Sequence, residues 1–459
     1  MSVFATLLLV LVALSACDKE PRTLADPTEL RFSLDTVNFD SVFVGRTSPT
    51  MTLSIYNPAR EEVRIPRISL QAGGASPYVA LVDGLPGPVV EDVRLAPHDS
   101  ILVFLRFRNE LATSDTISRC NDALVVRGGG REHTIPLVAW TVNVQPFDML
   151  DIRTDVVLDG DAGPRARLAT GSVTVHPGAS LRLTNGAQLY FPRECGLEVK
   201  GKLVLEGTRQ HPVVLGADRI DRYYRRALGL WNGVHLHPGS EGNVLRYAEI
   251  RNAVTALRVE EAKGASGVEL KLQWCKLLYY GLDALHLERS QAMLYGCLIA
   301  QGARNGLRLR SARAELEQTT VYSVLPELQL RQGPLVRLEE GEGNMLLVRN
   351  SILWGDREEE VVLTQADSES GRVLFTHSIL PFSDGDMRLG IVGEGCSNQA
   401  PDLENPLEGD FRPKAQSPAV GLGGVIAPLD GKDMLGRPFG SVGAERPVAG
   451  AYACVECPY

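Results

Sequence analysis

One pattern recurs six times between Gly233 and Leu380: Val234-His235-Leu236, Leu257-Arg258-Val259, Leu285-His286-Leu287, Leu307-Arg308-Leu309, Val336-Arg337-Leu338 and Val361-Val362-Leu363. The last residues of these fragments, at 236, 259, 287, 309, 338 and 363, are spaced by 23, 28, 22, 29 and 25 residues. Apolar residues in the two outer positions of each fragment predict a short strand that is buried on one face. Periods of this length are typical of proteins built from stacked coils.

A second fragment follows each of the first, with small, then mixed, then large apolar columns: Ala248-Glu249-Ile250, Cys275-Lys276-Leu277, Cys297-Leu298-Ile299, Thr320-Val321-Tyr322, Ser351-Ile352-Leu353 and Ser378-Ile379-Leu380. No helical pattern of ten residues or more separates the copies, so each copy must bury its apolar face on its neighbours. These features predict a right-handed parallel β-helix over residues 150–400. Eight coils at roughly 4.8 Å would make a rod about 40 Å long. Leu236, Val259, Leu287 and Leu309 should lie directly above one another.

Earlier fragments open the rod and place glycines at its tight corners, where a positive φ is required: Val173–Ala179, Leu181–Ala187, Gly196–Leu203, Leu205–Thr208 and His211–Leu215. With these fragments, residues 150–400 resemble the pectate-lyase-like β-helix proteins of bacterial surface families. That resemblance implies the fold but no single activity, because this fold hosts lyases, hydrolases, adhesins and plain stalks.

The first 17 residues form a targeting segment. Leu7 to Leu14 is an apolar run of signal-peptide length, too short to span a membrane. Leu14-Ser15-Ala16-Cys17 resembles the lipobox of bacterial lipoproteins, which implies acylation of Cys17 and a membrane anchor. Asp18-Lys19-Glu20 is similar to the tag that sends lipoproteins of Bacteroidetes-like bacteria to the cell surface. The alternative is an ordinary cleaved signal in which Cys17 is incidental.

Residues 18–29 are polar, contain two prolines and predict a tether. Residues 30–145 alternate short strands such as Leu53-Ser54-Ile55 and Ile101–Phe107 with turn clusters such as Gly128-Gly129-Gly130, which predicts a β-sandwich. Phe39–Gly45, Leu53–Pro58 and Leu95–Ser100 resemble the immunoglobulin-like domains of Hydin-type and bacterial surface proteins. Such domains are spacers or interaction modules.

Residues 401–459 follow the last coil. Asp410-Phe411-Arg412-Pro413, Ser417–Gly421 and Gly450-Ala451-Tyr452 are similar to the closing segment after β-helices in secreted Bacteroidetes-type proteins. We expect this segment to cap the exposed apolar rung and unpaired edge of the last coil.

Composition restricts the partners and the redox state. With 47 basic and 56 acidic residues and no basic stripe, the chain is not expected to bind nucleic acid. Removing Cys17 from the eight cysteines leaves seven, so at least one thiol is unpaired. Cys275 and Cys297 fall in one column of adjacent coils and are interpreted as buried thiols, with a disulfide as the alternative. Cys454 and Cys457 have CxxC spacing without a second pair for zinc, so a local disulfide or loose thiols are expected.

Charged residues line the outward face of the first strand. His235, Arg258, His286, Arg308 and Arg337 form a basic column beside His237, Glu260, Glu288, Arg310 and Glu339. One hypothesis is a groove for a charged glycan, with His286 and Glu288 as the nearest acid/base pair. The alternative is that opposite charges solvate the sheet, each exposed pair contributing only ~0 to 1 kcal/mol. No column stacks acids compactly enough for calcium, so no metal ligand is assigned.

Aromatic residues give a second candidate. Tyr247 and Trp274 share an outward column, which a sugar could stack on, although such rings more often lie flat over the sheet. The insertion Asp218–Arg226 either overhangs the groove or is a solvated loop. Glu358-Glu359-Glu360 is interpreted as a solvated turn.

The sequence therefore predicts an all-β chain, an immunoglobulin-like sandwich followed by a right-handed parallel β-helix, anchored by lipid in the outer membrane and exposed at the cell surface. Its expected work is binding, with a polysaccharide or a surface protein as partner, or structural presentation. Cleavage of acidic glycans by a lyase or glycoside hydrolase is the alternative. No cofactor is expected, and Ca²⁺ enters only under the lyase alternative.

Overall fold

The computed structural model describes residues 21–108, 117–264, 270–326, 331–364, 371–381, 391–424, 431–440 and 447–454. These residues form β-strands with three short 3₁₀-helices, η1 (Pro27–Glu29), η2 (Gly73–Ala75) and η4 (Pro406–Glu408). None of the described helical segments has the length and hydropathy to cross a bilayer. The chain divides into two compact units. The first contains the residues up to Asn143 together with the short segment Ile220–Arg222, and the second contains all other residues.

The first unit is a sandwich of two sheets around one apolar core, which confirms the predicted sandwich. Apolar side chains alternate in β9 (Ser100–Phe107), where Val103 and Leu105 are fully buried while Leu102 and Phe104 are exposed. The first sheet contains β1 (Arg22–Thr23), β5 (Val63–Leu70), β10 (Ser118–Gly128), β11 (Arg131–Val142) and β3 (Val37–Phe43), with β8 (Val89–Leu95) beside β5. The second contains β2 (Arg31–Phe32), β4 (Met51–Tyr56), β9 (Ser100–Phe107), β6 (Tyr78–Val82) and β7 (Leu85–Pro86).

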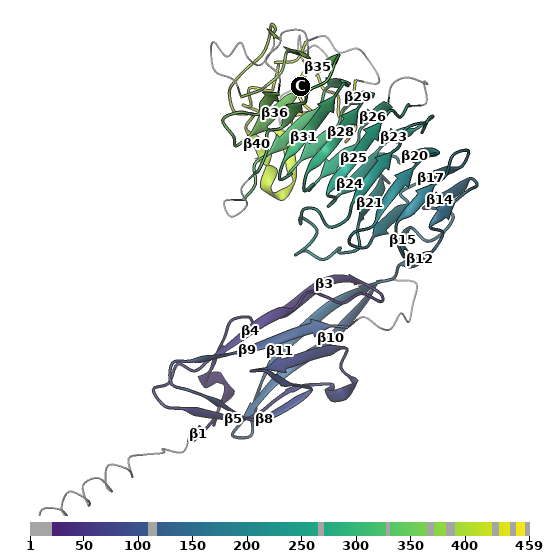
Figure 1. Cartoon of the computed structure of the whole chain (residues 1–459). Helices are drawn as coiled ribbons and strands as arrows, with labels where there is room; N and C mark the ends of the chain where they lie inside the picture. Colours follow the sequence, from purple (N-terminus) through teal and green to yellow (C-terminus); the bar gives the residue numbers. More distant parts are fainter. Residues whose placement is uncertain are drawn as a thin grey trace, which may run out of the picture. The chain divides into compact units, whose positions relative to one another are not determined.

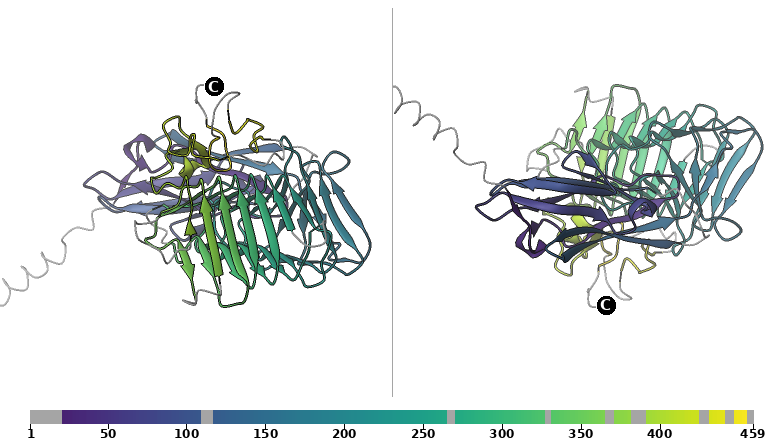
Figure 2. Two further views of the ribbon diagram at one scale, coloured as in Figure 1. Left: turned by 90° about the horizontal axis from the view of Figure 1, so that it is seen from above. Right: turned by 90° about the horizontal axis from the view of Figure 1, so that it is seen from below.

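The second unit is the predicted right-handed parallel β-helix. From β15 (Ala166–Ala169) to β38 (Gly371–Thr376), each strand pairs with the strand three places earlier in the chain, as β15 does with β12 (Gln145–Phe147). Successive coils therefore add one strand to each of three parallel sheets (Figure 1). Seen from above, the strands of one sheet run side by side along the unit (Figure 2). We name the sheets after their first strands.

The β12 sheet contains β12 (Gln145–Phe147), β15 (Ala166–Ala169), β18 (Gln188–Phe191), β21 (Val213–Ala217), β24 (Ala248–Arg251), β27 (Lys276–Leu278), β30 (Leu298–Ala300), β33 (Thr320–Ser323) and β36 (Ile352–Gly355). The β13 sheet contains β13 (Asp151–Ile152), β16 (Val173–Val175), β19 (Gly196–Val199), β22 (Gly233–Leu236), β25 (Thr255–Glu260), β28 (Asp283–Glu288), β31 (Asn305–Arg310), β34 (Val336–Leu338) and β37 (Val361–Leu363). The β14 sheet contains β14 (Val156–Asp159), β17 (Ser180–Thr184), β20 (Lys202–Glu206), β23 (Val244–Arg246), β26 (Leu270–Gln273), β29 (Gln291–Tyr295), β32 (Arg313–Glu317), β35 (Asn344–Arg349), β38 (Gly371–Thr376) and β39 (Ile391–Val392).

The predicted register of the β13 sheet is confirmed. Leu236 pairs with Val259, Val259 with Leu287, and Leu287 with Leu309. All four side chains are fully buried in one core that runs through the coils. The recurring triplets therefore fill the bore of the helix.

The β12 sheet corrects one predicted fragment. Val321, not Tyr322, pairs with Ile299, so the fragment is Thr319-Thr320-Val321. Thr319 rather than Thr320 accordingly joins the small column, where its backbone N–H donates to the Ser351 hydroxyl at 3.1 Å. A shift of one residue reverses the face of each side chain, which places Tyr322 on the outside. The sequence prediction also omitted the third strand of each coil between residues 233 and 380.

The described part of the C-terminal segment, which was expected to be a cap, lies on the outer side of the coils. Its strands β40 (Leu403–Asn405) and β41 (Asp410–Pro413) form an antiparallel pair. Its apolar residues, Phe411 and Tyr452 among them, pack on side chains from the outer side of several coils, from Tyr247 to Ile379. The described part of the segment therefore covers the flank of the coils, and its role as a cap of the last rung stays a prediction. The outer face there carries apolar residues such as Leu298, which need burial as much as an open end does.

Three smaller expectations can be compared with the structure. Cys275 and Cys297 are free, buried thiols, as interpreted, and Cys454 is disulfide-bonded. The interpretation of Glu358-Glu359-Glu360 as a solvated turn is wrong for Glu360, whose side chain is 1% exposed and pairs with Arg331. Cys17 lies outside the described residues.

Candidate functional site

The structure brings the predicted basic column together. His235 pairs with Arg258, Arg258 with His286, His286 with Arg308, and Arg308 with Arg337 on neighbouring strands of the β13 sheet. Each of these side chains points outward because the residues on either side of it face the bore. The column was thus placed correctly from the sequence.

Most charges in this column are neutralised by the sheet itself. The Arg258 guanidinium lies 3.3 Å from Glu260 and 3.4 Å from Glu288. Arg308 lies 2.7 Å from Glu339 and 3.5 Å from Asp283. Arg337 is the member whose guanidinium has no ion pair with a described residue. This pairing favours the interpretation that the column solvates and registers the sheet.

His286 and Glu288 are both held in their basic forms. Burial lowers the pKa of His286, and Arg308 and Arg258 lower it further. Burial alone would raise the pKa of Glu288, but Arg289, Arg258 and Arg310 outweigh it and the net pKa is lowered. An acid/base pair needs one group that keeps its proton near neutral pH. Neither side chain is held protonated in this structure, and no hydrogen bond joins the two, so their role as an acid/base pair stays a prediction.

Tyr247 and Trp274 do share a column. Both adopt left-handed backbone conformations, with φ of 46° and 52°, at the same corner of successive coils. Their rings stack at 5.0 Å between centroids, and the Trp274 Nε1–H donates to the backbone oxygen of Lys432 at 3.2 Å. The C-terminal segment buries both rings, so a sugar could stack on them only if that segment moved. Their role in ligand binding stays a prediction.

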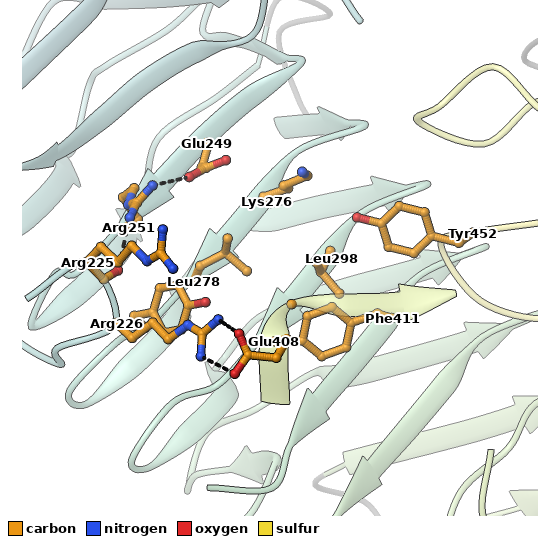
Figure 3. Close-up of a pocket in the computed structure, with 12 residues that line it drawn as sticks. Arg225, Arg226, Glu249, Arg251, Lys276, Leu278, Leu298, Glu408, Phe411 and Tyr452 are labelled. Carbon is orange, nitrogen blue, oxygen red and sulfur yellow. Dashed lines mark hydrogen bonds and ion pairs between the residues drawn. The ribbon is translucent and has the colours of Figure 1, made fainter. Parts of the chain in front are cut away.

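A cavity that the sequence did not indicate lies on the outer face of the β12 sheet (Figure 3). Its volume is about 240 Å³, and we call it the β12-sheet pocket. Its floor comes from β24, β27 and β30, one wall from the loop before β22, and the other from the C-terminal segment. It is lined by Arg225, Arg226, Glu249, Arg251, Lys276, Leu278, Tyr279, Leu298, Glu408, Gly409, Phe411 and Tyr452.

Four basic and two acidic side chains line this pocket. Only two of the four basic side chains form ion pairs within the described part of the chain. Arg226 holds Glu408 through two hydrogen bonds of 3.1 and 2.6 Å, and Arg251 lies 3.2 Å from Glu249 (Figure 3). The bond to Glu408 raises the pKa of Arg226, and the same bond lowers the pKa of Glu408. The side chains of Arg225 and Lys276 form no hydrogen bond or ion pair with a described residue, although the charge of Arg225 helps to lower the pKa of Glu408. The lining of the pocket therefore carries two more positive than negative charges.

Apolar and aromatic groups face these cations. Phe411 is buried against Tyr322 with ring centroids 5.6 Å apart, and Leu278 and Leu298 form part of the floor. Tyr452 lies across the cavity from Arg225 and Arg226 and turns its hydroxyl inward (Figure 3). Burial raises the pKa of Tyr452, so it is a neutral hydrogen-bond donor at physiological pH.

The sequence contained part of this signal. Glu249 and Lys276 are the middle residues of the second fragments, which predicted an outward column. The insertion was expected either to overhang a groove or to be a solvated loop, and its Arg225 and Arg226 do line the pocket. Glu408 and Phe411 could not be placed there, because no pattern links the C-terminal segment to a particular coil.

Comparisons with known proteins add little. No family model and no curated protein sequence matches the chain. One solved structure, a family 123 glycoside hydrolase from Clostridium perfringens, aligns over 28% of this chain and 26% of that chain, at 8% identity and a TM-score of 0.19. The catalytic domain of a GH87 α-1,3-glucanase in complex with nigerose aligns over 72% and 87%, at 7% identity and a TM-score of 0.14. Likeness at this level carries no argument about the activity of this chain.

Proposed function

We propose that the β-helix binds an acidic glycan and that one carboxylated sugar residue occupies the β12-sheet pocket. The observation that carries this proposal is the pair of unpartnered cations, Arg225 and Lys276, in a cavity that also offers an aromatic wall. Hydrogen bonds from cationic groups to a carboxylate are about twice as strong as neutral ones. The charge excess therefore selects an anionic ligand.

The size and the mixed lining of the pocket support a sugar. At about 240 Å³ the cavity is below the ~300 Å³ at the lower end of sites for drug-sized ligands, so it suits a single residue of a chain. Phe411 offers an apolar surface for a ring face, and the Tyr452 hydroxyl and the Glu249 carboxylate can hydrogen-bond to sugar hydroxyls.

We further propose that the chain is a lipoprotein of the outer membrane, exposed at the cell surface. The lipobox-like tetrad ending in Cys17 supports the anchor, and the acidic residues after it support surface display. In this proposal the sandwich is a spacer between the lipid and the glycan-binding coils.

Calorimetry with the purified protein tests the glycan proposal. We expect a polyuronate such as polygalacturonate to bind and dextran, which is uncharged, not to bind. Lys276→Ala and Arg225→Ala should each weaken binding by about 10- to 100-fold, since a hydrogen bond to a charged group contributes ~1.5–3 kcal/mol. Lys271→Ala is the matched control, because Lys271 is exposed on β26, away from the pocket. Equal affinity of all three variants would contradict the proposal.

The same samples test the alternative of glycan cleavage. Absorbance of an unsaturated product, with and without Ca²⁺, detects a lyase, and new reducing ends detect a hydrolase. Binding without either product supports a binding protein. Product formation would favour the enzyme, and no affinity for any acidic glycan would leave a structural stalk.

A further inference from the structure

Two histidines and a glutamate converge on the outer face of the β13 sheet, away from the β12-sheet pocket. His235 and His237 lie on and just after β22, and Glu198 lies opposite His235 on β19. One nitrogen of each histidine and one carboxylate oxygen of Glu198 all lie within 4.8 Å of one another. We propose that these three side chains bind a divalent transition-metal ion, with Zn²⁺ as the expected occupant.

The geometry is that of a three-ligand site. The Glu198 Oε2 atom is 2.6 Å from His237 Nε2 and 3.4 Å from His235 Nδ1. Ligand atoms of a tetrahedral zinc ion with bonds of about 2.1 Å lie about 3.4 Å apart. The His237–Glu198 distance must therefore open by less than 1 Å, and the ligand nitrogens of the two histidines lie within 4.8 Å of each other. Two imidazoles and one carboxylate leave a fourth position for water, as in open zinc sites.

A second carboxylate orients His235 for this role. Its Nε2 atom lies 3.3 Å from Glu260 Oε2, on the opposite side of the ring from Glu198. With a metal ion bound, a neutral His235 would donate its Nε2–H to Glu260 and present the lone pair of Nδ1 to the ion. A carboxylate behind a liganding histidine is the usual support of a metal site.

The backbone holds these ligands in place. Val199 and Leu236 pair across the two strands and are fully buried, so the outward residues beside them have little freedom. The two histidine rings lie 3.7 Å apart between centroids. The side chains of His235, His237 and Glu198 keep 20%, 25% and 37% of their surface exposed, which leaves the site open to an ion from solution.

The ligand types favour zinc over calcium or magnesium. Imidazole nitrogens suit Zn²⁺, whereas Ca²⁺ and Mg²⁺ prefer oxygen ligands. Glu260 is not counted as a ligand because Arg258 and Arg289 already hold it, at 3.3 and 3.2 Å. The site is independent of the proposed glycan binding, since none of its residues lines the pocket.

Titration of the full-length protein, prepared without a histidine tag, tests the proposal. We expect calorimetry to give one Zn²⁺ per chain and no binding of Mg²⁺ or Ca²⁺ here. Co²⁺ in the same site should produce the visible absorption of tetrahedral coordination. His237→Gln and Glu198→Gln should each weaken Zn²⁺ binding by more than about 100-fold, because even the loss of a supporting group costs 10- to 100-fold.

His176→Gln is the matched control. His176 also lies on the outer face beside a carboxylate, with its Nε2 2.8 Å from Asp151, but it has no second histidine there. Its replacement should leave the stoichiometry and the affinity unchanged. Circular dichroism shows whether each variant is folded. If one of the two ligand variants does not fold, the other one alone still tests the site. The proposal is overturned if the native protein takes up no Zn²⁺, or if the folded ligand variants bind it as the native protein does.

Discussion

The buried ion pair between Arg331 and Glu360 offers a stringent test of packing in the last coils. Both side chains are 1% exposed, with Nη1–Oε1 and Nη2–Oε2 distances of 2.5 and 2.9 Å. Glu360 also accepts hydrogen bonds from the backbone N–H groups of Leu335 and Arg357, each at 2.9 Å. Glu360→Gln keeps the shape of the side chain and removes its charge, so the guanidinium is left buried without its main counter-ion.

The expected cost follows from this geometry. Breaking a buried pair by removing one partner costs about 3–5 kcal/mol of unfolding free energy. Asp356 stays 3.0 Å from the Arg331 guanidinium and is 35% exposed, so it retains part of the stabilisation. We therefore expect about 3 kcal/mol. The control is Glu206→Gln, which makes the same chemical change in a pair with Arg182 whose side chains are 37% and 49% exposed. That change should cost ~0–1 kcal/mol.

Denaturant unfolding followed by tryptophan fluorescence measures both variants. Three of the four tryptophans, Trp231, Trp274 and Trp354, belong to the β-helix unit, so the signal reports on its unfolding. Adding Arg331→Met to Glu360→Gln should cost less than the sum of the single changes, because the double variant has no unpaired charge. If Glu360→Gln and Glu206→Gln were equally tolerated, the buried position of this pair would be refuted.

Three other predictions follow from single residues. Leu309→Asp should prevent stable folding, because it removes the packing of a fully buried leucine, worth about 2–5 kcal/mol, and buries a charge. Arg308→Gln, at the neighbouring outward position, should cost only about 1 kcal/mol of unfolding free energy. Comparable melting curves of the two variants would contradict the register. Burial depresses the pKa of His286 below 6.5, so the unfolded chain binds a proton more readily. The free energy of unfolding should therefore be constant with respect to this group above pH 6.5 and decrease as the pH falls below 6.5. Unfolding experiments at several pH values should show that this decrease is absent in His286→Gln. Cys17→Ser should move the protein from the membrane fraction to the soluble fraction, and unchanged fractionation would exclude the anchor.

The sequence determined the fold well where one rule decided it. A period of two along the strand and a recurring spacing of 22 to 29 residues sufficed to place Leu236, Val259 and Leu287 in one column. The rule failed at Thr320-Val321-Tyr322, because the apolar Val321 and Tyr322 fit either face. Only the neighbouring coils select the register in which Val321 pairs with Ile299.

The proposed zinc ligands Glu198, His235 and His237 could have been recognised as neighbours from the sequence, but the spacing used to align the coils did not bring them together. Leu197-Glu198-Val199 has the same pattern as Val234-His235-Leu236 and occupies the preceding coil. The two fragments are 37 residues apart instead of 22 to 29, because the insertion around Asp218–Arg226 lengthens this coil. Aligning the triplets by pattern and not by spacing would have put Glu198 beside His235.

The outer faces of the β12 and β13 sheets differ in how their charges are compensated, and the C-terminal segment explains the difference. A parallel sheet presents a flat outer surface, on which long side chains reach their neighbours in the adjacent coils and pair, as Arg258 does with Glu260 and Glu288. On the β12 sheet, Phe411 and Glu408 stand above the strands and close a cavity over Lys276. Glu408 pairs with Arg226 of the facing wall, and no acid in the described part of the segment forms an ion pair with Arg225 or Lys276. Concavity and unpaired charge thus arise together where the C-terminal segment covers the coils. Such a place is where an organic ligand gains most from desolvation.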